Sequence, residues 1–249
     1  MSNDATFNQH INNKCSSIKL LIAWALRTFT SRRPSVMLTL WMTLIRCHIE
    51  YCSQLWSPHK TGALQSIELL QKSFLNRIDG LYSLDYWEQL SHLKLYSLER
   101  RRERYRIIYT WRVIEGQVPN FDSTPITSRH TSKRLGRMCV VPPVTSPTGN
   151  AITSIREASL PIMGPQLFNV LPLELRNLTE CSVEDFKTEL DQFLASIPDQ
   201  PLLPGLTQFR RIDSNSIIDW VHSPYLPVQT VQPKPSLRRR CAAEAVTRR

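Results

Sequence analysis

The chain has 249 residues, with 31 lysines and arginines against 21 aspartates and glutamates, which gives a formal net charge of +10 and a pI near 9.6. This balance favours an anionic partner, and nucleic acid is the first candidate. The chain holds only seven glycines against 17 prolines and contains neither a glycine-rich phosphate loop nor a Gly-x-Ser-x-Gly motif, which argues against a dinucleotide-binding fold and against a serine hydrolase.

Helical periodicity dominates the first half of the chain. After a polar lead-in over residues 1–14, a first helix is expected over 15–29, and residues 30–34 interrupt it. Ser35 is the expected N-cap of a second helix, from Val36 to about Tyr51, which is apolar nearly all round and therefore expected to be central. A third helix follows over 64–78 with Gly80 as its C′ residue, and a short one over 86–93. The expected inner stripes are Ile18, Leu21, Ile22, Ala25, Leu26 and Phe29 in the first helix, and Leu64, Ile67, Leu70, Phe74, Leu75 and Ile78 in the third.

An arginine-rich segment follows and is predicted to form one helix, with Ser97 as N-cap and Gly116 as C′ residue. Helical spacing puts arginines inside its apolar stripe, where each needs a carboxylate or a phosphate opposite it. The residues on that side are Leu98, Arg101, Arg102, Tyr105, Ile108, Tyr109 and Arg112.

Phosphate contact is the functional interpretation of these cations. Arg100, Arg104 and Arg106 lie off the stripe, where we expect them to be free to meet phosphates. For Arg101 and Arg102, phosphate contact and pairing with Glu68, Glu88 or Glu99 are equally supported. Trp111 is a candidate stacking surface for a base, whereas packing in the core is favoured for Tyr105 and Tyr109. Exposed basic patches, which solvation alone would also explain, are expected at 32–33 and 133–134. The candidate nucleic-acid-binding residues are Arg32, Arg33, Arg100, Arg101, Arg102, Arg104 and Arg106.

Prolines interrupt the chain from Val118 onward. The strand candidates are 138–141 and 151–155, which would form a β-hairpin. A short helical turn is expected at Pro172, and Ser182 with Asp185 predicts a capping box that opens a helix. Beyond Pro198 the chain is predicted to be irregular, with one anchor at 219–220 and a disordered basic tail.

The expected fold class is mainly α, with a helical bundle over about 15–116. The chain is expected to divide into four segments: 1–117 (helical domain), 118–165 (proline-rich linker with the hairpin), 166–200 (short helical unit) and 201–249 (tail).

Six cysteines occur without a Cys-x-x-Cys pair or zinc-ligand spacing, so we expect no cofactor and no metal. Cys47 and Cys52 lie in an apolar helical run and are predicted to be small buried hydrophobes. That run also contains Arg46, His48 and Glu50, so it is predicted to be a core helix and not a membrane span. With a polar N-terminal segment, these features predict an intracellular protein of the cytoplasm or nucleus, without a membrane or small-molecule partner.

Several short motifs occur in order along residues 1–200. The first group is Ser31-Arg32-Arg33, Met37 to Trp41, Leu44-Ile45 and Glu50 to Pro58. The second is Ile67-Glu68, Gln71-Lys72, Phe74, Tyr86 to Leu90 and Leu93-x-Leu95-x-Ser97-Leu98-Glu99-x-Arg101-Arg102. The last is Gly136-Arg137-Met138-Cys139 with Phe168-Asn169-x-Leu171-Pro172-x-x-Leu175-Arg176-Asn177. Together they resemble the region after the catalytic palm in reverse transcriptases of non-LTR (LINE, jockey-like) retrotransposons, where Trp usually stands in place of Phe168.

This resemblance implies a thumb-like, C-terminal part of an RNA-directed DNA polymerase. Such a polymerase places two Mg²⁺ ions about 3.5–4 Å apart on paired carboxylates, including an Asp-Asp turn, and this chain has no Asp-Asp dipeptide. We therefore expect it to bind nucleic acid, primer–template or RNA, without catalysing synthesis by itself, with the missing palm as a second partner. The alternatives are a non-catalytic helical protein-interaction module, a non-functional relic of a mobile element, or a fragment that needs the palm to fold.

Overall fold

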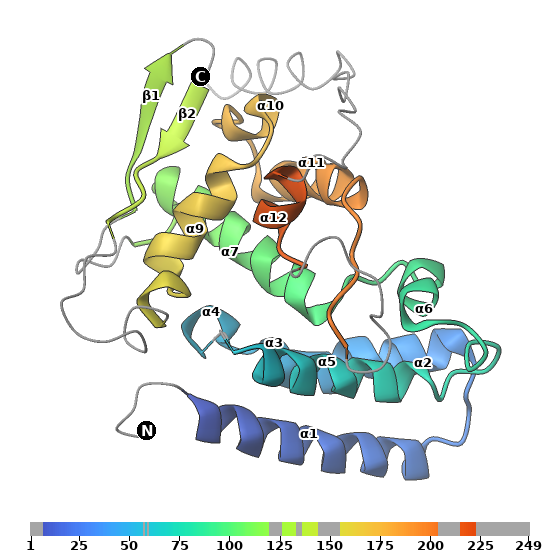
Figure 1. Ribbon diagram of the computed structural model, residues 1–249. Coiled ribbons are helices and arrows are strands. Elements are labelled where there is room, and N and C mark those ends of the chain that lie inside the picture. Colours follow the sequence, from blue (N-terminus) through green and yellow to red (C-terminus); the bar gives the residue numbers. More distant parts are fainter. Residues whose placement is uncertain are drawn as a thin grey trace. The chain divides into compact units, whose positions relative to one another are not determined.

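The computed structural model (Figure 1) describes residues 7–56, 58, 60–119, 126–132, 136–143, 155–203 and 215–222. These residues are mainly helical and include one two-stranded antiparallel sheet, so the predicted mainly α fold class is confirmed. The chain divides into two compact units that interleave along the sequence: Met1–Tyr105 with 143–160 and 199–216, and Arg106–Pro142 with 161–198 and 217–249. The division into segments 1–117, 118–165, 166–200 and 201–249 stays a prediction.

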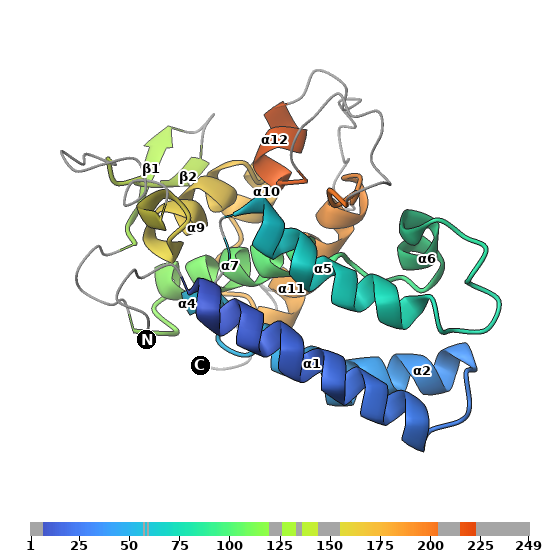
Figure 2. The ribbon, with the colours of Figure 1, turned by 60° about the horizontal axis from the view of Figure 1, so that its bottom comes forward.

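The first unit is built from helices. The helix α1 (Asn8–Thr28) runs alongside α5 (Thr61–Leu75) and contacts the segment formed by α2 (Pro34–Leu40), η1 (Trp41–Ile45) and α3 (Arg46–Glu50), as Figure 2 shows. The short helices α4 (Ser53–Trp56) and α6 (Tyr86–His92) complete this part. The next helix, α7 (Leu98–Ile114), contributes its residues up to Tyr105 to the first unit and the remainder to the second.

The start of α1 differs from the prediction. Residues 8–14 are helical and not a polar lead-in, because Ile11 lies one turn before Cys15 and both are buried on the inner stripe of the helix. That stripe continues through Ile18, Ile22 and Ala25, as predicted, whereas the expected Phe29 is exposed. The next helix begins at Pro34, with Arg33 and not Ser35 as its N-cap, because proline fits the first helical position.

The predicted second helix contains a π-helical turn, η1. Its buried residues Met37, Trp41, Ile45 and Ile49 recur every four positions, which exceeds the 3.6 residues of a regular turn. In η1 the Arg46 N–H donates to the carbonyl five residues back, at Trp41. The wider turn keeps this row on one face. The helix therefore supplies one buried row to the core, and its other side is exposed at Met42 although the sequence is apolar nearly all round.

The core of the first unit joins these helices. A tilted ring contact between Trp41 and Phe74, with centroids 5.3 Å apart and an interplanar angle of 33°, links η1 to α5. The expected third-helix stripe is largely buried, although α5 ends at Leu75, and Gly80 takes a positive φ of 80° in the turns that follow. The core residues from the predicted stripes are Ile18, Ile22, Ile67, Leu70, Phe74, Leu75 and Ile78, and Leu203 joins them from the predicted irregular region.

Both predicted ends of α7 are confirmed. The Ser97 hydroxyl accepts a hydrogen bond from the Arg100 N–H at 3.0 Å, as an N-cap does. Gly116 has a φ of 69°, and the Gln117 N–H donates to the Arg112 carbonyl, which closes the helix.

The second unit contains the only sheet among the described residues. Strand β1 (Ser128–Ser132) pairs antiparallel with β2 (Gly136–Cys139), and Arg129 lies opposite Met138. A hairpin is therefore present, but its pairing differs from the prediction: Val140 and Val141 lie beyond β2, and the partner of β2 is β1 and not 151–155. Of that expected strand, residues 151–154 lie outside the described residues and Ile155 is helical.

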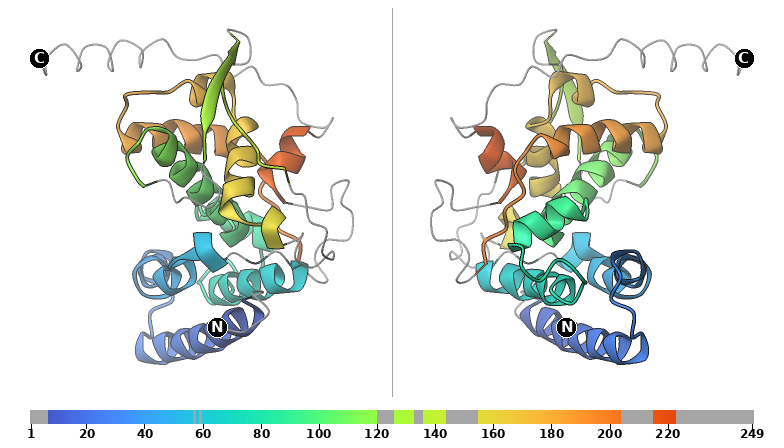
Figure 3. Two further views of the ribbon diagram at one scale, coloured as in Figure 1. Left: turned by 90° about the vertical axis from the view of Figure 1, so that its left-hand side faces the viewer. Right: turned by 90° about the vertical axis from the view of Figure 1, so that its right-hand side faces the viewer.

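Helices surround this hairpin. The helix α9 (Leu160–Asn169) forms where prolines were expected to interrupt, because Pro161 occupies its first turn and Pro165 removes only one hydrogen bond. The turn predicted at Pro172 is α10 (Leu173–Arg176), and the capped helix is α11 (Val183–Ala195), where the Ser182 hydroxyl accepts from the Asp185 N–H. Figure 3 shows α11 beside the second half of α7, where Trp111 and Phe186 stack with centroids 4.4 Å apart.

Two of the sequence motifs meet in the second unit. The Gly136–Cys139 motif is β2, and its Arg137 guanidinium donates to the Arg176 and Leu178 carbonyls at 3.0 and 3.1 Å. In return, the Asn177 carboxamide accepts from the Arg137 N–H, and Asn169 exchanges two hydrogen bonds with the Cys139 backbone. A Cβ at Gly136 would lie 2.4 Å from Leu173 Cδ1. The two motifs therefore specify one packed contact.

The predicted irregular tail contains ordered residues. The helix α12 (Ile217–His222) includes the expected anchor at 219–220, Leu203 and Ile217 are buried, and Asn215 is 1% exposed. The expectation of an irregular segment with a single anchor was therefore wrong for 217–222, which form a helix, while 204–214 and 223–249, including the expected disordered tail, lie outside the described residues.

Candidate nucleic-acid interface

The cations of α7 were the first candidates for phosphate contact, and the structure gives them carboxylate partners. The Arg101 guanidinium forms an ion pair with Glu50 at the end of α3 and donates to Tyr105 Oη at 2.6 Å. The Tyr105 hydroxyl in turn donates to Glu50 Oε2 at 3.0 Å. Burial lowers the pKa of Arg101, but the Glu50 carboxylate more than offsets this, so the pKa is raised. Glu50 was not among the glutamates expected to pair with this arginine.

Arg100 is fully buried, with 0% exposure. Its guanidinium donates to the Asn215 carbonyl at 3.2 Å and lies 4.0 Å from an Asp199 carboxylate oxygen. Asp199 also accepts hydrogen bonds from the Ser97 N–H and hydroxyl, at 2.7 and 2.6 Å. Arg100 therefore ties the start of α7 to the chain after α11, and the expectation that it faces solvent was wrong.

Arg102 is buried beside the carboxyl group of Glu68, which itself lies on α5. Glu68 accepts from Tyr86 Oη at 2.6 Å and from the Leu98 N–H at 3.0 Å, so it occupies the N-terminal end of α7. Burial raises the pKa of Glu68 to about 7, against the lowering effect of the Tyr86 hydrogen bond and of Arg102. Burial lowers the pKa of Arg102, and Glu68 is the foremost of the carboxylates that oppose this. Of the two interpretations given for Arg102, pairing with a glutamate is therefore the one that accounts for its position.

The remaining α7 candidates are also enclosed to differing degrees. Arg106 is buried, contrary to the expected exposure, and Arg104 is half-buried. Trp111 has no exposed surface, and its indole N–H donates to the Leu178 carbonyl at 3.1 Å, so it cannot stack on a base. The α7 cluster is thus a structural element in which charged side chains replace part of the apolar core.

The two candidates between α1 and α2 have different environments. The Arg32 guanidinium donates to the carbonyls of Leu26 and Phe29 and so satisfies the C-terminal end of α1. Arg33 is exposed. Lys133 and Arg134, the other expected basic patch, lie outside the described residues.

A second basic region was not identified from the sequence, and it includes α1. No aspartate or glutamate occurs from Ala5 to Ile49, whereas Lys14, Lys19 and Arg27 lie on α1. Lys19 and Arg27 are exposed, and neither they nor Lys14 and Arg33 form an ion pair within the part of the chain that the structure describes. The absence of acidic residues over this stretch is the sequence signal for this region, whereas local arginine density points to α7.

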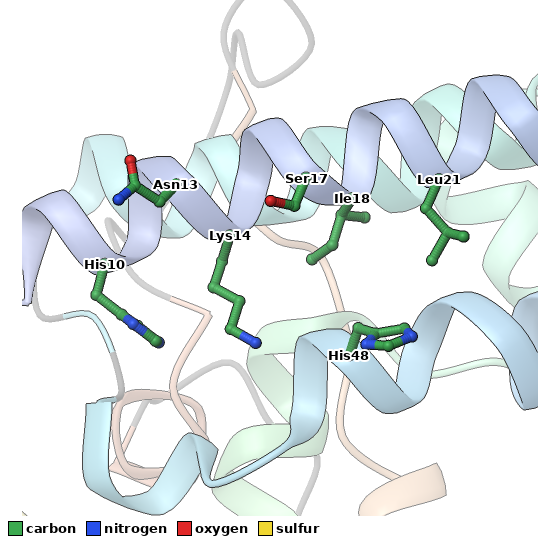
Figure 4. A pocket seen from close by; sticks show the side chains of 7 residues that line it. All are labelled: His10, Asn13, Lys14, Ser17, Ile18, Leu21 and His48. Carbon is green, nitrogen blue, oxygen red and sulfur yellow. The ribbon is translucent and has the colours of Figure 1, made fainter.

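A pocket of about 360 Å³ lies between α1 and α3 in this region (Figure 4). The side chains of His10 and Lys14 extend from α1 into the space between the helices, and His48 lines its opposite side from α3, with its ring on the side of Ile18 and Leu21. His10 is held by edge contacts with Phe7 and Trp56, at centroid distances of 6.4 and 5.5 Å. The lining contains no carboxylate and consists of His10, Asn13, Lys14, Ser17, Ile18, Leu21 and His48.

The cysteines and potential metal ligands form no other candidate site. Cys15 and Cys139 are buried, and burial raises the pKa of the Cys139 thiol to about 12. Cys47 and Cys52 are exposed, so their predicted burial was wrong. No group of three or more histidine, cysteine, aspartate or glutamate side chains suited to a metal ion occurs within the described ranges. The helices described for this chain include none with the length and apolar character of a membrane span.

Comparison with protein-family models, with curated proteins and with solved structures finds no match to this chain.

Proposed function

We propose that this chain is a nucleic-acid-binding, non-catalytic region of an RNA-directed DNA polymerase of the non-LTR retrotransposon kind, with the palm of such a polymerase as its partner. The basic surface over α1 and its following loop would hold the nucleic acid. Without an Asp-Asp dipeptide, the chain alone would not catalyse DNA synthesis.

The observation that carries the proposal is the acid-free stretch from Ala5 to Ile49. Lys19, Arg27 and Arg33 are exposed there and have no carboxylate within the same stretch to neutralise them. Cations of this kind attract a polyanion and release its condensed counterions on binding. The net charge of +10 acts in the same direction.

The buried arginines of α7 support this proposal indirectly. Because Glu50, Glu68 and Asp199 neutralise charge around Arg100, Arg101 and Arg102, much of the charge density in α7 is satisfied internally. The excess positive charge of the first unit then lies on α1 and the loop after it. The contact between the Gly136–Cys139 and Phe168–Asn177 motifs adds support for the resemblance, since residues far apart in sequence belong to one structural feature.

Binding of fluorescently labelled oligonucleotides, measured by anisotropy over a series of salt concentrations, tests the function. We expect affinity to fall as salt rises, with a slope that reports the phosphates neutralised. A triple variant, Lys19→Glu, Arg27→Glu and Arg33→Glu, should weaken binding by at least about 10-fold. The matched control is Lys60→Glu, Arg77→Glu and Lys94→Glu, three exposed cations of the same unit that lie outside the acid-free stretch.

Equal losses in the two triple variants would mean that net charge and not the α1 surface governs binding, and absence of salt-dependent binding would overturn the function itself. Charge reversal at Arg100, Arg104 and Arg106 is not a suitable test, because two of these side chains are buried and the variant would unfold.

A helical protein-interaction module is the second candidate. Tyr51 and Leu55, at 70% and 68% exposure, lie in and beside α4, next to the paired Glu50. Exposed apolar residues of this size are a common feature of binding surfaces. Tyr51→Ser with Leu55→Ser should leave nucleic-acid binding unchanged, and a loss of binding to a protein partner on this substitution would favour the module.

A further inference from the structure

One side of α1 combines cationic, polar and aromatic residues. His10, Lys14, Ser17, Trp24 and Arg27 recur at spacings of three, four or seven, which places them along one side of the helix. Their span of 17 residues corresponds to about 25 Å at 1.5 Å per residue. The row borders the buried stripe of Ile11, Cys15, Ile18, Ile22 and Ala25.

The first half of this row is the pocket of Figure 4. A lysine ammonium carries three hydrogen-bond donors and no acceptor, and an imidazole offers at least one ring N–H donor in either protonation state. Lys14 and His10 from α1 and His48 from α3 surround the space without a carboxylate among the lining residues. The rings of Phe7 and Trp56 fix the position of His10. The pocket therefore suits a small anion such as a phosphate group.

The second half of the row is an exposed aromatic surface. Trp24 is 47% exposed, and its ring meets the Phe29 ring edge-on at 6.4 Å, which restrains the indole. Leu20, at 72% exposure, lies one turn before it, and Arg27 lies one turn after it. An exposed indole beside a cation is the surface on which proteins stack unpaired bases.

These features distinguish a single strand from a duplex. The faces of bases in a duplex are covered by neighbouring base pairs, whereas a single strand can place a base on an aromatic ring while its backbone follows a basic row. Lys14 and Trp24 lie ten residues apart, or about 15 Å along the helix axis, so a phosphate and a stacked base of one strand would contact them together.

We propose that this row of α1 is a binding site for single-stranded nucleic acid, with a backbone phosphate in the pocket of His10, Lys14 and His48 and a base stacked on Trp24. This inference rests on the proposed function and adds the strand form and the contacts. The variants that test it change Lys14 and Trp24, two side chains that the triple charge reversal leaves in place.

Anisotropy with a labelled 12-nucleotide oligothymidine and with a duplex of equal length tests the site on the full chain. We expect tighter binding to the single strand. Trp24→Ala should weaken single-strand binding about 10-fold and change duplex binding less than twofold, while Trp24→Phe should restore most of the affinity. Lys14→Ala should weaken binding and reduce the salt slope by about one unit. The matched controls are Tyr82→Ala, an exposed ring of the same unit, and Lys60→Ala.

Three outcomes overturn the inference. If the wild type binds single strands with a salt-dependent affinity but Trp24→Ala and Lys14→Ala bind within twofold of it, the site is elsewhere and the proposed function stands. Equal or tighter binding to the duplex removes the single-strand specificity. If the wild type binds neither oligonucleotide, the proposed function and this site fail together.

Discussion

The helices α7 and α1 show how differently two basic segments can be used in one protein. The sequence of α7 is far richer in arginine, yet Arg100 and Arg102 are buried and Arg101 is paired with Glu50. The sequence of α1 holds only two lysines and one arginine, but Lys19 and Arg27 are exposed and have no ion-pair partner among the described residues. The helix with fewer cations therefore presents more available charge.

This difference shows that the placement of carboxylates decides the role of a cation. Arg100, Arg101 and Arg102 each lie near an acidic residue from another element, respectively Asp199, Glu50 and Glu68. A buried ion pair requires both members, since removal of either leaves an uncompensated charge in a medium of low dielectric. The surface of α1 lacks such partners, so substitutions there should change binding and not folding.

The largest effect that separates the two helices is expected at Glu68. Glu68→Ala removes the acceptor for Tyr86 Oη and the Leu98 N–H and leaves Arg102 without its main counter-charge. We expect a loss of about 3–5 kcal/mol in the free energy of unfolding, measured by urea titration. The control is Glu184→Ala, which removes an exposed surface pair with Lys187 and should cost less than about 1 kcal/mol. Similar losses for both variants would contradict a buried charge network at the start of α7.

The same residue predicts how stability changes with pH. The pKa of Glu68 in the folded protein, about 7, lies above the ordinary value of 4.5, so the folded state binds this proton more tightly than the unfolded chain. Stability is therefore fully present below about pH 4.5 and falls as pH rises through 7, by about 3 kcal/mol in total. Burial also raises the pKa of Glu99, so this residue likewise makes the folded protein less stable as pH rises.

Urea unfolding at pH 5 and pH 8 measures this effect, with Glu68→Gln as the comparison variant. Glutamine cannot ionise, so the difference in the free energy of unfolding between pH 5 and pH 8 should be smaller in the variant than in the wild type. A wild type that is equally stable at both values would rule out an ionisable group with this environment.

A smaller effect is expected for the ion pair that joins α7 to α3. A double-mutant cycle of Arg101→Met and Glu50→Gln should give a coupling energy of about 1–2 kcal/mol, because the pair is only partly exposed and Tyr105 also binds Glu50. Each single variant and the double variant are compared by urea titration. Additive losses in the double variant would show that the two side chains contribute independently.

The smallest effects on folding are expected on α1. Lys19→Ala and Arg27→Ala should each change the free energy of unfolding by less than about 0.5 kcal/mol, since both side chains are exposed and have no ion-pair partner among the described residues. The measurement is again urea titration, beside oligonucleotide binding. A clear loss of stability would mean that these cations have a structural role, and the contrast with α7 would disappear.

Much of the local structure could be predicted from the sequence. Ser97, Gly116 and Ser182 act as the predicted helix-end residues, and the stripe of α5 is largely buried where periodicity placed it. These features depend on residues within one or two helical turns of each other, so a short window of sequence contains the necessary information. The start of α1 was missed because Asn8 to Lys14 contains only one apolar residue, Ile11.

Other elements depended on packing against distant residues. The helix α9 forms despite Pro165, whose ring is buried, and local propensity does not predict this. The strand β2 was expected to pair with residues that follow it, whereas its actual partner, β1, precedes it. Periodicity identifies a strand, but it does not identify the strand with which it pairs.

The sequence alone determined the mainly helical class, both ends of α7, the start of α11, the positive net charge and the acid-free stretch from Ala5 to Ile49. Only the tertiary structure decided which cations face solvent. Leu98 meets Glu68 across 30 positions of sequence, Arg101 meets Glu50 across 51, and Arg100 meets Asn215 across 115. Because charge neutralisation acts through space over a few ångströms, a helix rich in arginine became part of the interior, and a helix with fewer cations became the candidate binding surface.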